Sequence, residues 1–143
     1  MSQNESAVLA VARLGRVFEK RLADDGMTLP QFRVLSFLSE GEWAASKVAD
    51  WLSVSRPSLT SLVDGLVERG WVERKESPTD RRCVLHHLTP SGQERLAEAT
   101  DLLAGALDGL LEHLDDDERA RAEEGLALVH TATRRNVGAA VTA

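Results

Sequence analysis

Hydrophobic positions near the N-terminus recur every three or four residues. Between residues 7 and 22 the apolar positions on this spacing are Val8, Val11, Leu14, Phe18 and Leu22. The spacing places all five on one face of a helix whose opposite face is solvated. Two aspartates and a glycine at residues 24–26 end the pattern. It therefore predicts a first amphipathic helix with one buried face.

A second helix is predicted by the stretch "TLPQFRVLSFL", residues 28–38. Thr28 suits the N-cap, and Gln31, three residues later, suits the reciprocal hydrogen bond of a capping box. Pro30 is tolerated because the first turn of a helix does not use its N–H groups internally. The core face of this helix is expected to consist of Phe32, Leu35 and Leu38.

Two further helical patterns lie close together in the middle of the chain. The first covers about residues 45–52 and is apolar at Val48, Ala49 and Leu52. The second begins after Ser55, a favoured N-cap residue, and has Pro57 in its first turn. Its apolar stripe consists of Leu59, Leu62, Val63, Leu66 and Val67. Gly70 is suited to end it, because glycine adopts the left-handed conformation that follows many helices.

The polar face of this second helix is unusual in composition. It carries Arg56, Ser58, Thr60, Ser61, Asp64 and Gly65. A solvated helix face usually carries long Glu and Lys side chains, whereas short hydroxyls let a helix approach another surface closely. Two helices joined by a tight turn match a helix-turn-helix, whose second helix enters the DNA major groove. A plain helical hairpin within a bundle remains the alternative at this stage.

A β-hairpin is predicted directly after these helices. Trp71, Val72 and Glu73 lead one strand, residues 84–88 form the return strand, and residues 77–80 are turn formers. Such a hairpin would be a wing, and Arg81 and Arg82 at its tip could enter the electronegative minor groove. Asp80 is expected either to hold one of these arginines by a charge-assisted bond or to cap the turn backbone.

Two long amphipathic helices are predicted at the C-terminal end. The first covers residues 90–113, with one face formed by Leu96, Ala99, Leu103, Ala106 and Leu110. Asp115 and Glu118 fit a capping box for the second, which is expected to end near Arg135. These helices present more apolar surface than one small core needs, so we expect a second subunit to cover part of it. The alternative is that both helices fold back on their own chain.

Composition and charge sharpen this picture. At 143 residues and 43% hydrophobic, the chain has the size of one ordinary domain with a core. Its formal charge of −6 gives no general reason to expect nucleic-acid binding. Residues 43–90, however, contain seven basic and six acidic side chains, so the rest of the chain carries −7. This asymmetry is compatible with a different partner for the middle of the chain, or with ordinary scatter.

Cysteine usage and the terminal sequence predict a cytoplasmic protein. A lone cysteine, Cys83, cannot form an intramolecular disulfide, and no signal peptide or long apolar span is evident. Cys83 is expected to be a small packed strand residue, with an oxidation-sensing thiol as the alternative.

Histidine spacing gives no support for a catalytic or metal centre. His86 and His87 are adjacent, so on a strand they point to opposite faces and cannot easily share a metal. We expect both to be surface or interface residues. His113 and His130, expected in the last two helices, could meet across a dimer layer, which leaves an adventitious metal as an alternative. We predict no enzymatic activity, no cofactor and no metal.

The combined motifs resemble the MarR family of winged helix-turn-helix regulators. The wing signature of that family corresponds to Asp80, Arg81 and Arg82, followed by "LTPSG" at residues 88–92. "LPQFRVLSFL", "KVADWLSVSRPSLTSLVDGLVERGWVER" and the helix order are also similar. The resemblance implies a mainly α fold with a small β-hairpin wing. It further implies one domain over residues 1–143, with the DNA-binding part at 28–89 and dimerisation helices at 5–25 and 90–137.

The resemblance also implies a partner and a mechanism. A homodimer would bind double-stranded DNA at a pseudo-palindromic operator and act as a repressor that a small aromatic effector releases. The expected DNA contacts are Lys47, Ser55, Arg56, Ser58, Thr60, Ser61, Arg74, Arg81 and Arg82, with Lys47 and Arg74 on phosphates. Possible walls of an effector pocket are Phe18, Phe32, Phe37 and Trp43, each of which could instead be core. The rival hypothesis is a winged helix that binds protein and not DNA, which the net negative charge favours.

Overall fold

A computed structural model describes the backbone of residues 1–142 and the side chains of residues 1–136. The predicted domain, residues 1–143, thus has its last residue outside the described part. The elements in chain order are α1 (Gln3–Asp24), α2 (Leu29–Leu38), β1 (Trp43–Ala44), α3 (Ala45–Leu52), α4 (Arg56–Glu68), β2 (Val72–Glu76), β3 (Val84–Leu88), α5 (Pro90–Leu111) and α6 (Asp116–Thr142).

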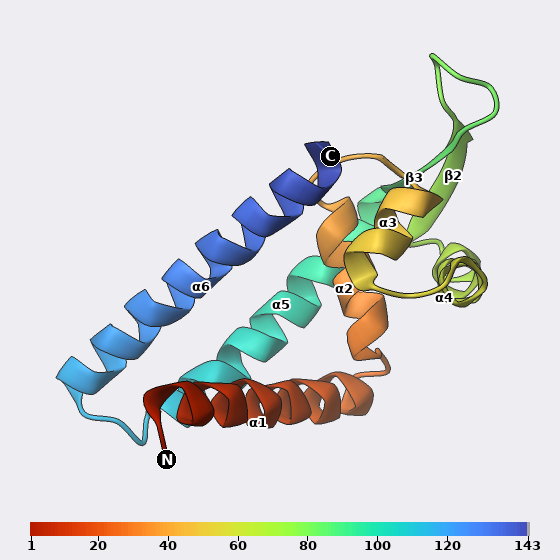
Figure 1. The fold of residues 1–143 in the computed structure, drawn as a ribbon. Coiled ribbons are helices and arrows are strands. Elements are labelled where there is room, and N and C mark those ends of the chain that lie inside the picture. The colour runs from red at the N-terminus through yellow and green to blue at the C-terminus, as the bar shows by residue number, and fades with distance from the viewer. Residues whose placement is uncertain (143) are drawn as a thin grey trace.

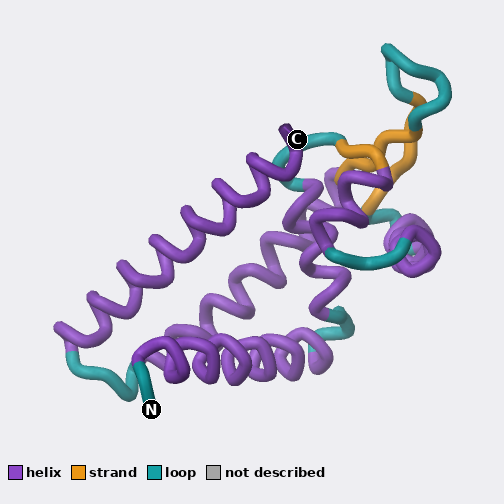
Figure 2. The backbone as a smooth tube through the Cα atoms, viewed as in Figure 1, coloured by secondary structure: helices purple, strands orange, loops and turns teal. Residues whose placement is uncertain are grey.

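The elements are arranged in two parts (Figure 1). Helices α2 to α4 and the small sheet form a compact head, and the hairpin of β2 and β3 projects from it as a wing. The long helices α1 and α5 extend away from this head, whereas α6 runs apart from α5 and returns toward the head, where Arg134 pairs with Glu40 (Figure 2). The predicted mainly α fold with a wing and terminal helices is therefore confirmed.

Local hydrogen bonds explain where several helices begin. Thr28 and Gln31 form the predicted capping box of α2, with N–H to side-chain oxygen distances of 2.9 and 3.2 Å. Asp115 forms the predicted box with Glu118 before α6. Helix α1, predicted within residues 5–25, begins slightly earlier, at Gln3, because Ser2 and Glu5 form a capping box. The predicted end of α6 near residue 135 is wrong, since the helix continues to Thr142.

The core lies between the head and α5. Leu22, Val34, Leu35, Val48, Leu59, Val63, Leu66, Val72 and Ala99 are among its buried members. The buried faces of α2 and α5 differ slightly from the predicted ones. Phe32 is half-buried whereas Val34 is fully buried, and Leu110 is exposed whereas Leu111 is buried. At 3.6 residues per turn, the neighbour of a predicted position can face the core equally well where the helix packs at an angle.

The sheet has three strands, in the order β1, β3, β2. The predicted hairpin is confirmed, with Val72 opposite Leu88 and Glu76 opposite Val84. The two-residue strand β1 was not predicted, and it pairs Trp43 with His86 on the other edge of β3. Strand β3 is therefore central.

Helices α1 and α6 expose large apolar side chains. Val8, Val11, Leu126, Leu128 and Val129 are between 38 and 69% exposed. None of the described helices combines the length and the apolar composition that a membrane span requires. Large apolar side chains that are exposed together usually mark an interaction site, so α1 and α6 present an uncovered apolar face.

Candidate nucleic-acid interface

The N-terminus of α4 is built by a short network of hydroxyl groups. Ser55 is the N-cap, and its Oγ accepts the Ser58 N–H at 3.2 Å and donates to Ser58 Oγ at 2.9 Å. Thr60 Oγ1 donates to the carbonyl of Arg56 at 2.9 Å. Because the bonds are local, the hydroxyls keep free lone pairs toward solvent. All five predicted positions here, including Ser61, are exposed on one surface of the head.

The turn before α4 brings this surface close to α3. Ser53 adopts a left-handed conformation, with a φ of 55°, immediately after α3 ends. The Val54 N–H then donates to the carbonyl of Ala49 at 3.1 Å, which tightens the connection. The two helices and this turn form the helix-turn-helix that the sequence predicts. Lys47 lies half-buried on α3, the first of the two helices.

The wing carries its two arginines at an exposed tip. Arg81 and Arg82 lie in the loop between β2 and β3, which projects from the head (Figure 1), and both are exposed. The Asp80 carboxylate accepts the backbone N–H of Arg82 at 3.0 Å, and the Cys83 N–H donates to the carbonyl of Asp80. Within the described wing, Asp80 forms no ion pair with either arginine. Of the two roles expected for Asp80, the structure shows the turn cap.

Cys83 and the histidines differ in part from their predictions. Cys83 is half-buried, as a packed residue would be, but it lies in the turn one residue before β3. The expectation that His86 lies at a surface or interface is wrong, because it is 5% exposed on the central strand. His87 is half-buried and contacts Glu73 at 3.1 Å. His113 lies in the turn after α5, not in a helix.

Burial changes the chemistry of His86. Its Nδ1 lies 3.2 Å from the carbonyl oxygen of Trp43 on β1. Burial lowers the pKa of His86, and the nearby positive charges of Arg74 and Arg56 lower it further, while the bond to Trp43 acts in the opposite direction. His86 is therefore a neutral packing residue between the sheet and α4 at neutral pH.

An ion pair joins α4 to the wing. Arg74 on β2 reaches Asp64 on α4, with Nη2 and Oδ1 2.5 Å apart. A hollow of about 300 Å³ lies between the two elements, and Arg74, Asp64, Thr60 and His86 are among its lining residues. The next residue of β2, Lys75, pairs with Glu42. Sequence reasoning placed Arg74 on phosphates but missed its partner, because the two side chains lie ten residues apart on different elements.

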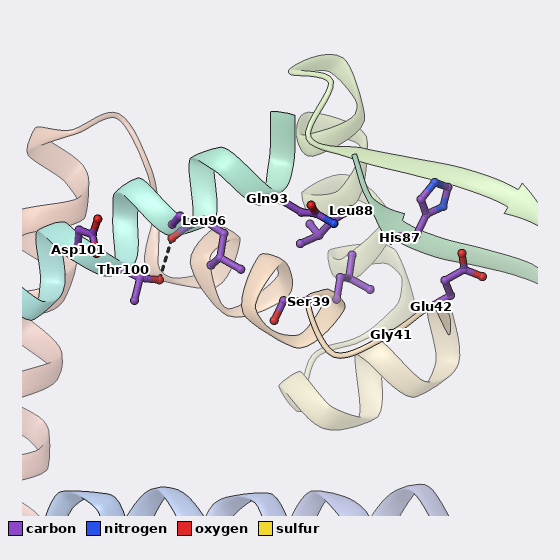
Figure 3. Close-up of a pocket in the computed structure, with 11 residues that line it drawn as sticks. Ser39, Gly41, Glu42, His87, Leu88, Gln93, Leu96, Thr100 and Asp101 are labelled. Carbon is purple, nitrogen blue, oxygen red and sulfur yellow. Dashed lines mark hydrogen bonds between the residues drawn. The ribbon is translucent and has the colours of Figure 1, made fainter. Parts of the chain in front are cut away.

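The four aromatic residues expected around an effector pocket all lie in the hydrophobic core or pack against it. Phe37 is buried and packs against Trp51 and Trp43, with ring centroids 4.7 and 5.3 Å apart. Phe18 and Phe32 are partly buried against the same core. A groove of about 660 Å³ lies elsewhere, between the end of α2 and the first half of α5 (Figure 3). Its lining includes Ser39, Glu42, Leu88, Gln93, Leu96, Thr100 and Asp101.

No metal centre is formed by the side chains that the structure describes. Among residues 1–136, no group of three or more His, Cys, Asp or Glu side chains is placed to hold a metal ion.

Comparisons with known proteins agree on one family. The sequence profile of the MarR family matches residues 25–82. The chain is 32% identical over 126 residues to YfiV, an uncharacterized HTH-type transcriptional regulator of Bacillus subtilis, covering 87% of this chain and 78% of that protein. Wild-type apo MarR from E. coli is similar in structure, with a TM-score of 0.82, 28% identity, and coverage of 90% of this chain and 96% of that one.

A DNA complex is also among the similar structures. A cysteine-to-serine mutant of E. coli MarR complexed with operator DNA has a TM-score of 0.67 and 29% identity, over 88% of this chain and 91% of that one. Sequence likeness, element order and the exposed wing thus agree with one another. The chain belongs to the MarR family of winged helix-turn-helix transcriptional regulators.

Proposed function

We propose that this chain is a sequence-specific, double-stranded DNA-binding repressor that acts as a homodimer on a pseudo-palindromic operator. One observation carries the proposal: the exposed, short polar face of α4 lies beside a projecting wing with two exposed arginines at its tip. The likeness to a MarR mutant complexed with operator DNA supports DNA as the partner. The relatives are transcriptional regulators, and none of them favours a winged helix that binds only protein.

The proposed contacts divide by role. Arg56, Ser58, Thr60 and Ser61, after the N-cap Ser55, face base edges in the major groove, where arginine and hydroxyl groups distinguish base pairs. Arg81 and Arg82 enter the flanking minor groove, whose negative potential attracts guanidinium groups. Lys47 and Arg74 contact phosphates, which fix the register of the protein on the duplex.

The uncovered apolar faces of α1 and α6 support the dimer. Val8 and Val11 on α1, and Leu128 and Val129 on α6, are each more than half exposed in the single chain. A second copy would cover these positions without any further partner, because two-fold interfaces are self-complementary. Residues 5–25 and 90–137 are accordingly the proposed dimerisation helices, and the side chain of residue 137 lies outside the described part. DNA as partner places the protein in the cytoplasm.

The most specific element of the proposal is that the protein binds a small aromatic effector. The groove beside α5 has a volume in the range of small-molecule sites and lies between the head and a proposed dimerisation helix. A panel of aromatic acids and phenols, tested by thermal shift, should stabilise the wild-type protein and not a Leu96→Trp variant with a filled groove. Stabilisation of both proteins would place the effector elsewhere, and stabilisation of neither would end this part of the proposal.

The decisive experiment is selection of bound duplexes from random DNA. Nuclease-treated full-length protein should enrich one site with two related halves at physiological salt. Size-exclusion chromatography with light scattering should give twice the chain mass at micromolar concentration. No enrichment over non-specific DNA would overturn the DNA-binding proposal, and a monomer would overturn the dimer.

A further inference from the structure

The head, residues 28–89, is joined covalently to the long helices at two points. One is the loop between α1 and α2, and the other is the step from β3 into α5 at Thr89. The angle between the head and α5 therefore depends on the core packed between them and on what holds these two connections together. Three side chains meet there: Arg69 after α4, Trp71 before β2 and Arg95 on α5.

Both arginines lie over the ring of Trp71. The guanidinium carbon of Arg69 is 4.9 Å from the ring centroid, and that of Arg95 is 5.5 Å away. At these distances a cation is attracted to the electron-rich face of an indole. Arg69 and Trp71 belong to the head, whereas Arg95 belongs to a long helix. The ring contact thus crosses the boundary between the two parts.

The same two arginines also hold the other connection. Arg69 Nη1 donates to the carbonyl of Gly26 at 3.0 Å. Arg95 Nη2 donates to the carbonyl of Asp25 and pairs with its carboxylate, both at 2.8 Å. Gly26 has a φ of +77°, so this loop already turns sharply at the end of α1. Each arginine therefore ties the first connection to the indole ring.

Backbone contacts leave little freedom at the second connection. Thr89 Oγ1 donates to the carbonyl of Gly70 at 2.5 Å, and its N–H donates to the carbonyl of Trp71 at 3.1 Å. A Cβ on Gly92 would lie 2.0 Å from the same Trp71 carbonyl oxygen, so α5 starts directly against the backbone of Trp71. A change in the direction of α5 must therefore move Trp71, and with it the start of the wing.

We propose that Arg69, Trp71 and Arg95 form a junction clamp that fixes the angle of each head, and so determines which spacing between operator half-sites the dimer accepts. The inference rests on the proposed dimeric DNA binding. Two heads that read successive major grooves must stand about 34–36 Å apart. One base pair adds about 3.4 Å, so a small rotation at each junction, carried out to α4, changes the matching spacer.

A clamp with only a structural role would behave differently. Weakening it would lower stability and reduce affinity equally for every spacer length. A positioning role changes the preference among spacer lengths, because a looser head can follow half-sites that the wild-type geometry rejects.

The test uses operators whose half-sites are moved apart or together by one and two base pairs. Wild-type protein should prefer one spacing at least tenfold over a two-base-pair change. Arg95→Gln and Arg69→Gln should each reduce that preference to threefold or less. Arg33→Gln is the matched control, because Arg33 lies over the Trp51 ring at 5.6 Å within the head and away from the junction. An unchanged spacing preference in both junction variants would overturn the clamp.

A second measurement needs no DNA and separates the two proposals. A Cys83→Ser, Thr79→Cys protein carries one spin label on each wing, and pulsed electron resonance gives the distance distribution between the two labels of the dimer. Arg95→Gln, or the milder Arg95→Lys if the first variant does not fold, should broaden this distribution. An unchanged distribution would overturn the clamp even where operator binding is intact. Absence of operator binding by wild type would overturn the DNA-binding proposal, while a broadened distribution would still show the clamp.

Discussion

Arg74 on β2 donates to the Asp64 carboxylate on α4 across 2.5 Å, and this contact joins the wing to the helix proposed to read DNA. Asp64 shares its helix face with Arg56, Ser58 and Thr60, all of which are exposed. An unpaired carboxylate on that face would repel the phosphate backbone. The ion pair therefore makes the negative charge on α4 compatible with DNA binding.

A double-mutant cycle distinguishes two roles for Arg74. If it mainly neutralises Asp64, Arg74→Ala should weaken operator binding roughly tenfold, about 1.4 kcal/mol, and adding Asp64→Ala should restore most of the loss. The effect on stability should be only about 0.2–1 kcal/mol, because the pair is largely exposed. Gel shifts and urea unfolding measure the two quantities. A double variant as weak as Arg74→Ala alone would show that Arg74 acts through the proposed phosphate contact and not by neutralising Asp64.

The wing arginines should contribute to affinity and to its salt dependence. The Arg81→Ala/Arg82→Ala variant should bind the operator at least about tenfold more weakly, and the slope of log affinity against log salt should fall by about 1–2. Arg33→Ala removes one positive charge from the exposed surface of α2, outside the proposed DNA contacts and dimerisation helices, and serves as the control. Gel shifts over a salt series provide the measurement. Unchanged affinity in the double variant would refute the role of the wing.

Gly92 should tolerate no side chain. Its Cβ would lie 2.0 Å from the carbonyl oxygen of Trp71, and both positions are fixed by backbone. Gly92→Ala should therefore lower the free energy of unfolding by about 3 kcal/mol or more. Gly65→Ala, on α4 with nothing within 4 Å, should instead raise it by about 0.5–1 kcal/mol. Urea denaturation midpoints compare the two, and equal midpoints would contradict the close approach at Gly92.

His86 should make stability depend on pH. Its pKa is lowered by burial from the usual 6.5, so the folded protein binds fewer protons than the unfolded chain just below that pH. The free energy of unfolding should be fully retained above about pH 6.5 and fall as pH drops from there through the folded pKa of His86. The slope from one proton is at most about 1.4 kcal/mol per pH unit.

One variant isolates this contribution. His86→Asn keeps a donor near the position of Nδ1 but cannot titrate, so its unfolding free energy should decline less than that of wild type between pH 7.5 and 5. Parallel curves for wild type and His86→Asn would show that His86 does not couple protonation to folding.

Helix starts and the hairpin could be predicted from the sequence because they depend on short-range contacts. The capping boxes at Thr28 and Asp115 each join residues three apart, and Ser55 caps α4 through the N–H of Ser58. The strands of the wing are connected by a short turn and match the predicted return strand, residues 84–88. Alternation, capping and turn chemistry depend on residues that are close in sequence. They are therefore largely independent of the tertiary contacts made elsewhere in the chain.

Only the tertiary structure decided which of these residues act together. Strand β1 is two residues long, too short to leave a pattern, yet its pairing with β3 buries His86. Two contacts join different elements: the ion pair of Asp64 with Arg74, and the contact of Arg95 with the Trp71 ring. No periodicity in the sequence could reveal either contact. The sequence by itself determined helix α4 with its short polar face, and the wing with its two arginines. How the wing is tied to α4, and the head to α5, depends on side chains that meet only after the elements pack.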